Sequence, residues 1–214
     1  MFSSRPARAL CLCVCLVISL PLAAETLDDG LLELSWFGDG IEFHDANKID
    51  YLWVRDGFRF EGQSVHFEEW PEPELIGPEA EERDVEDRRL ARQMASDLHR
   101  IFQDAWTRHL DIESSLEEGD LLVTGRIVDC STGNQAAKML VGFGAGAGYV
   151  TIDLKVTDKA SGDLMMAIHH RVVSGTGWST TDSKFAKWVE KAAKKAAKEG
   201  GFAALYADGD PADD

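Results

Sequence analysis

A regular alternation of apolar and polar residues near the middle of the chain constrains its fold more than any other feature. The apolar positions are Val150, Ile152, Leu154 and Val156, and the polar positions between them are Thr151, Asp153, Lys155 and Thr157. Side chains of a β-strand point alternately to opposite faces of a sheet, so this pattern predicts a strand with one buried face. The segment Asp158 to Gly162 then favours a turn, and an apolar run from Leu164 to Val173 follows it. We therefore expect an antiparallel hairpin.

Three further segments have the composition of strands. They are Ile49 to Val54, Gln63 to Trp70 and Leu121 to Cys130. Each combines β-branched or aromatic residues with flanking glycine, aspartate or proline, which end strands.

Two segments show helical periodicity. In residues 84–109 the apolar side chains recur three and four positions apart, and the first turn is acidic, as the helix dipole favours. The second helix begins after Thr181-Asp182, is apolar at Phe185 and Trp188, and stops at Gly200-Gly201.

The order of elements, β-β-α-β-β-β-α, predicts an α+β fold. We expect a two-layer sandwich in which two amphipathic helices cover a mostly antiparallel sheet of about five strands. This single domain spans residues 48–205 and contains an acidic loop of prolines and glutamates at 71–82. Residues 25–47 are expected to form an irregular arm that docks against the domain. The acidic tail, 206–214, is expected to be disordered.

The first 24 residues have the three parts of a secretory signal peptide. Arg5 and Arg8 give a positive start, Ala9 to Leu20 is apolar, and small residues follow at Ala23-Ala24. The apolar run is shorter than the roughly 20 residues that span a bilayer. We expect cleavage near Ala24, a periplasmic location and no stable membrane insertion.

Cleavage would leave one cysteine, Cys130, because Cys11, Cys13 and Cys15 lie in the apolar run and none has the flanking residues for lipid attachment. Cys130 then has no partner for an internal disulfide, and we expect it to be buried at the end of a strand. Removing residues 1–24 takes away two arginines and no acid, so the net charge moves from −16 to −18. Such a surface repels phosphate groups, which makes nucleic acid and anionic lipid poor partners.

The segment Val141 to Gly148 has glycine at every second position. Neither the spacing nor the context, with a strand and no helix after it, matches a phosphate-binding loop. In an extended chain these glycines leave one face without side chains, so another backbone can approach closely. Two interpretations remain open: the bare face packs inside the protein, or it contacts a partner chain. The candidate interaction strand is Gly142, Phe143, Gly144, Ala145 and Gly146.

Residues with catalytic or metal-binding chemistry form no recognisable motif. The histidines are His44, His66, His99, His109, His169 and His170. No pair has the spacing of a zinc-binding helix, and no Gly-x-Ser-x-Gly sequence occurs. His66 and Glu68 share one face of a predicted strand and are the best candidate pair for acid–base chemistry. We predict no catalytic, metal-binding or cofactor-binding residue.

Several segments around the hairpin resemble a bacterial envelope family known only as a domain of unknown function, number four-four-one-zero. The matching segments are Gly125-Arg-Ile-Val-Asp129, Gly133-Asn134, Val141-Gly-Phe-Gly-Ala-Gly146, Val150 to Val156, and Asp158 with Ser161-Gly162. The similarity covers roughly Ile49 to Lys198 and is sharp at residues 121–175. The resemblance implies an exported α+β domain without an established activity. Many members look like lipoproteins. This chain differs from them because it lacks a lipid-acceptor cysteine at the end of its signal peptide.

The leading prediction is a soluble, non-enzymatic periplasmic module that binds or assembles something in the cell envelope. Its partner would be an unknown envelope protein or a second copy of the chain. One alternative is a periplasmic enzyme of unrecognised type that uses carboxylates, or His66 with Glu68. The other is a structural subunit that self-associates through the glycine-rich strand.

Overall fold

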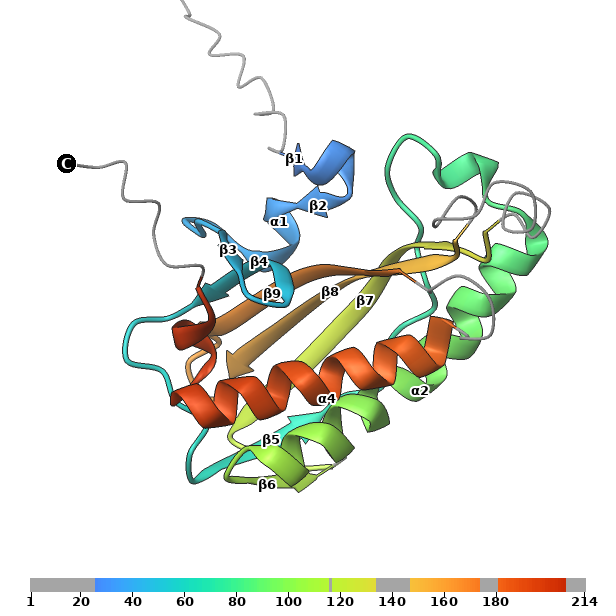
Figure 1. Cartoon of the computed structure of the whole chain (residues 1–214). Helices are drawn as coiled ribbons and strands as arrows, with labels where there is room; N and C mark the ends of the chain where they lie inside the picture. Colours follow the sequence, from blue (N-terminus) through green and yellow to red (C-terminus); the bar gives the residue numbers. More distant parts are fainter. Residues whose placement is uncertain (1–25, 116, 134–146, 174–180, 207–214) are drawn as a thin grey trace, which may run out of the picture.

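The computed structural model describes residues 26–115, 117–133, 147–173 and 181–206. A seven-stranded sheet dominates these residues, with the strand order β3-β4-β9-β8-β7-β5-β6 (Figure 1). Its strands are β3 (His44–Ala46), β4 (Ile49–Val54), β5 (Gln63–Phe67), β6 (Ile112–Ser115), β7 (Leu121–Ser131), β8 (Tyr149–Asp158) and β9 (Leu164–Val173). The predicted α+β class is confirmed, with more strands than the expected five. The predicted signal peptide (1–24) and nearly all of the acidic tail (206–214) lie outside the described residues.

The sheet is mixed rather than uniformly antiparallel. β8 pairs with β7 on one side and with β9 on the other, both antiparallel, and β4 continues the antiparallel order beside β9. The predicted hairpin is therefore confirmed. β5, in contrast, is parallel to both β6 and β7. The chain between β5 and β6 passes through a long helix, and such a crossover returns the next strand in the same direction.

Two long helices, α2 (Val85–His109) and α4 (Thr181–Glu199), cover one face of the sheet (Figure 1). Short 3-10 turns, η2 (Ala80–Glu82) and η3 (Phe202–Leu205), lie at their ends. The carboxylate of Asp84 accepts hydrogen bonds from the N–H groups of Glu86 and Asp87. These bonds fix the start of α2, at the position that the acidic residues of the sequence predicted.

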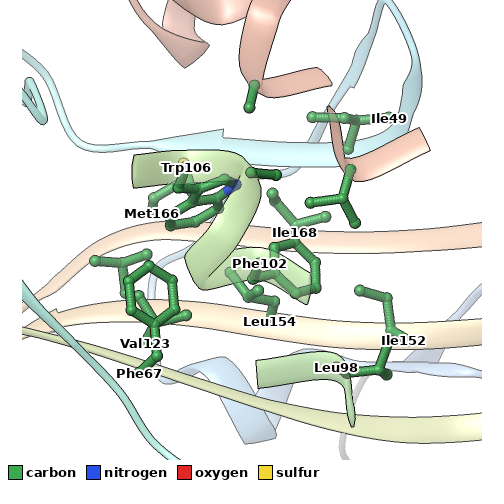
Figure 2. Close-up of a cluster of buried hydrophobic side chains, with 14 of the residues drawn as sticks. Ile49, Phe67, Leu98, Phe102, Trp106, Val123, Ile152, Leu154, Met166 and Ile168 are labelled. Atoms are coloured by element: carbon green, nitrogen blue, oxygen red, sulfur yellow. The ribbon is translucent and has the colours of Figure 1, made fainter. Parts of the chain in front are cut away.

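The main core lies between these helices and the sheet. Figure 2 shows side chains of α2 pointing at side chains of the central strands. The facing residues are Leu98, Phe102 and Trp106 from α2, and Val123, Leu154 and Met166 from β7, β8 and β9, each at most 1% exposed. Cys130 is buried beside this core as a free cysteine, as predicted, and burial raises the pKa of its thiol to about 12.

The opposite face of the central strands is also covered, which the sequence pattern did not indicate. Thr151 and Asp153, two of the polar positions of β8, have no exposed surface. The N-terminal arm forms a third layer there (Figure 1). It consists of β1 (Thr26–Leu27), η1 (Asp28–Gly30), β2 (Leu32–Glu33) and α1 (Leu34–Phe37). The expectation of a two-layer sandwich with one buried face is thus wrong at the centre of the sheet.

The acidic loop at 71–82 is held against the sheet. The N–H of Ile76 donates to the carbonyl of Val128, 2.8 Å away, along the part of β7 that β5 does not reach. Just before the loop, Trp70 is buried and its ring stacks on Phe102 at 5.8 Å. A Cβ atom at Gly125 would overlap that indole ring, so only glycine leaves room for it.

Candidate binding site

The candidate interaction strand, Gly142 to Gly146, lies outside the described residues. The end of the glycine-rich segment is described at Gly148, which is buried. A Cβ atom there would lie 2.7 Å from the carbonyl oxygen of Ser131, so Gly148 permits a close approach between two backbones.

The structure does not bring the predicted pair His66 and Glu68 together as a site. His66 is half-buried in β5 and Glu68 is exposed just after it. Within the described residues, no hydrogen bond or ion pair joins their side chains. His170 lies on β9, where its Nδ1 is 3.0 Å from Asp50 Oδ2 and its ring stacks on that of Trp188 at 4.2 Å.

The densest group of ionisable side chains lies under the arm. We call it the cationic face: Arg126 of β7, Lys155 of β8, and His169 and Arg171 of β9, arranged around the carboxylate of Asp153. Arg126 donates to Asp153 Oδ2 through Nε at 2.8 Å, and a second guanidinium nitrogen lies 2.7 Å from the same oxygen. Nδ1 of His169 lies 2.6 Å from Asp153 Oδ1. The register explains this grouping, because Asp153 pairs directly with Arg126 on one side and His169 on the other.

The arm supplies acids that match these cations. Asp28 Oδ2 lies 3.0 Å from Nε2 of His169 and 3.8 Å from the guanidinium of Arg171. Glu33 Oε2 lies 3.0 Å from the guanidinium of Arg126. The arm and the cationic face are therefore complementary in charge.

Trp36 completes the contact between the arm and the cationic face. Lys155 Nζ lies 4.2 Å from the centre of the Trp36 ring and donates a 3.0 Å hydrogen bond to its carbonyl. The guanidinium of Arg126 lies over the same ring at 4.8 Å. Such cation–π contacts contribute more where water is excluded. Leu32 and Phe37 add apolar contacts around Ala167, in a small second core on this face.

Two pKa shifts follow from this environment. Burial alone would lower the pKa of His169, but the hydrogen bonds and charges of Asp153 and Asp28 outweigh it, and the pKa is raised. Burial and the positive charge of Arg126 lower the pKa of Lys155.

A second buried cluster lies towards the glycine-rich segment. Arg83 Nε donates to Asp129 Oδ1 at 2.8 Å, and the hydroxyl of Tyr149 donates to Asp129 Oδ2 at 2.9 Å. Burial, followed by the charge of Asp129, raises the pKa of Tyr149 to about 12. The ring of Tyr149 also lies 4.9 Å from the guanidinium of Arg171, which connects this cluster to the cationic face.

The chemistry open to the cationic face is recognition of anions. In the described part of the chain, no group of three histidine, cysteine, aspartate or glutamate side chains is placed to hold a metal ion. The cationic face has four basic side chains and one buried carboxylate. It therefore presents a positive surface when the arm does not cover it. Sequence reasoning missed this site, because Asp153 lies beside His169 only after the register between β8 and β9 shifts at Val156 and Thr157.

Comparison with known proteins gives a family but no function. No curated protein matches the chain. A PelC dodecamer from Paraburkholderia phytofirmans is 9% identical, with 67% of this chain and 94% of that chain covered and a TM-score of 0.46. A Xanthomonas campestris protein described by the DUF330 model is 11% identical, covering 71% and 90% with a TM-score of 0.38. A neuraminyllactose-binding hemagglutinin homolog from Helicobacter pylori is 13% identical, covering 69% and 91% with a TM-score of 0.28.

At these identities and TM-scores the three likenesses carry no argument about this chain.

Among the described helices, none has the length and apolar character needed to cross a membrane. The family model named Domain of unknown function (DUF4410) matches residues 53–193, which include β5 to β9, α2 and most of α4. The chain belongs to this DUF4410 family.

Proposed function

We propose that this chain is an exported, non-enzymatic binding or assembly module of the cell envelope, and that it binds an acidic polypeptide segment on the cationic face. One observation carries the proposal. In a protein of net charge −16, Arg126, Lys155 and Arg171 gather with His169 on one face of the sheet, beneath an acidic and aromatic segment of the same chain. The arm shows what kind of ligand fits this face.

Because the cationic face is charged, the arm can leave it without exposing a large apolar surface. Arginine and lysine regain their hydration when they are exposed, so the sheet remains soluble without the arm, whereas an apolar face of this size would promote aggregation. The acids of the arm are also partly exposed, at 26% for the side chain of Asp28 and 36% for that of Glu33. Partly exposed ion pairs contribute little to stability. The apolar contribution of the arm comes mainly from Leu32 and Phe37, at about 1.5–3 kcal/mol each.

Titration with an arm peptide tests the proposal. The full chain with Asp28→Lys and Glu33→Lys repels its own arm from the cationic face and leaves that face accessible. We expect this variant to bind a synthetic peptide of residues 26–37 in isothermal titration calorimetry, and to bind it more weakly at high salt. Binding should also weaken as the pH rises through the pKa of His169, because the neutral ring no longer attracts Asp28. A peptide with Asp28→Asn and Glu33→Gln should bind more weakly and should not show this dependence on salt.

The matched control is the full chain with Glu117→Lys and Glu118→Lys. Both residues are exposed after β6, and the pair changes the net charge by the same amount without touching the arm. This control should not bind the peptide. A folded Asp28→Lys, Glu33→Lys protein that ignores the peptide, or a control that binds it equally well, refutes the proposal.

A second candidate function, a periplasmic enzyme, is favoured by the geometry of His169. A buried aspartate that holds Nδ1 and leaves Nε2 available is the arrangement of a histidine general base. Here Nε2 is 3.0 Å from Asp28, so the arm occupies the position that a substrate would need. Binding is therefore the better supported function.

A further inference from the structure

The arm is joined to the rest of the chain by a short hinge at residues 38–40. Gly38 has φ 116° and ψ 179°, and Gly40 has a φ of 75°. Both conformations lie in regions that side chains of L-residues rarely adopt, and that of Gly38 is almost exclusive to glycine. The chain can fold its arm back onto its own sheet only because glycine occupies these two positions.

The hinge has room to open. It lies beside a hollow of about 670 Å³, lined by Gly38, Gly40 and Ile41 of the hinge region and by Trp53 and Leu164 across from them. A Cβ atom added at Gly38 or Gly40 would have no atom within 4 Å. The two glycines thus have space for a change of backbone conformation, while Phe37 before the hinge and Ile41 after it pack in the same apolar cluster.

The surface that receives the arm is the same in every copy of the chain. Asp28 would meet His169 and Glu33 would meet Arg126 whichever copy supplied the arm, so an exchange loses none of these contacts. Exchange of an identical element between protomers is a low-cost route to association. It competes with closure of the arm on its own chain, which a short linker favours by a high effective concentration.

We propose that the partner recognised by the cationic face is the arm of a second copy, and that copies of the chain associate by exchanging arms about the Gly38–Gly40 hinge. This inference rests on the proposed function and adds the identity of the segment. The acidic arm is a segment shown to fit the face, and the charge complementarity between them favours this occupant over an unrelated acidic chain.

Alanine at the hinge tests the exchange. Gly38→Ala and Gly40→Ala strain the closed hinge but not an extended one, which should raise the association constant of the dimer by about 5- to 150-fold for each alanine in a hinge that opens. Sedimentation equilibrium over a range of concentrations measures this gain. Gly57→Ala is the matched control, because Gly57 has a φ of 75° and equally open surroundings but lies outside the hinge. If the double variant does not fold, Gly40→Ala alone gives the same test with a smaller gain.

Adding Asp28→Asn and Glu33→Gln to the hinge variant should lower the association constant of its dimer, because the exchanged arm then lacks its charged contacts. The inference is overturned if the folded hinge variant stays monomeric, if loss of these acids leaves the association constant of its dimer unchanged, or if Gly57→Ala dimerises as well. Peptide binding without hinge-dependent dimerisation would retain the proposed function and reject the exchange. Absence of both would reject both.

Discussion

Replacing Asp153 by alanine is expected to destabilise the folded state by about 3–5 kcal/mol, because it leaves buried cations without their counter-ion. The side chain of Asp153 has no exposed surface and contacts both Arg126 and His169. Urea unfolding followed by circular dichroism measures the loss. Arg126 retains Glu33 and His169 retains Asp28, each at 3.0 Å, but both of these acids are partly exposed and replace only part of the lost interaction.

Two comparisons separate this effect from a general loss of acidic charge. Asp163 is also paired with an arginine, Arg55, but its side chain is 55% exposed, so Asp163→Ala should cost no more than about 1 kcal/mol. Adding Arg126→Met to Asp153→Ala should recover part of the loss, because it removes one of the unpaired cations. Equal costs for Asp153→Ala and Asp163→Ala would contradict the buried network.

Replacing Gly125 by valine is expected to cost about 3 kcal/mol, near the upper end for overpacked cores. The new side chain would overlap the indole ring of Trp70, which cannot move away because it stacks on Phe102. Thermal and urea unfolding measure the stability, and near-ultraviolet circular dichroism reports any displacement of the ring.

Trp70→Ala provides the coupling test for Gly125. Alone it should cost about 3–5 kcal/mol, since it removes a buried aromatic side chain. Combined with Gly125→Val, the total should fall well below the sum of the two single costs, because valine then fills vacated space. Additive costs would show that the two residues do not interact.

The hairpin and both helices could be predicted from the sequence because their patterns are long and regular. The short edge strands could not. β6 is Ile-Glu-Ser-Ser and β3 is His-Asp-Ala, and neither has enough apolar residues to show a period. They form because β5 and β4 offer backbone hydrogen bonds, which no local pattern reveals.

The cationic face could be predicted only in part. Asp153 and Lys155 occupy alternate positions of β8, and charged residues at such positions ordinarily indicate a solvent face. Their burial depends on the arm, whose acids and aromatic residues show no periodicity. The packing role of Gly125 could not be predicted either. It depends on Trp70, a residue 55 positions away in the sequence.

The occupant of the cationic face can be identified by photo-crosslinking in cells. The ring of Tyr51 lies 5.7 Å from that of His169, so p-benzoylphenylalanine at position 51 would label whatever segment covers the face. We expect crosslinks to residues 28–37 of the same chain and also to an acidic segment of another chain, with the intermolecular share rising when Asp28→Lys and Glu33→Lys displace the arm. Crosslinks confined to the chain itself in both proteins would contradict a binding role for this face.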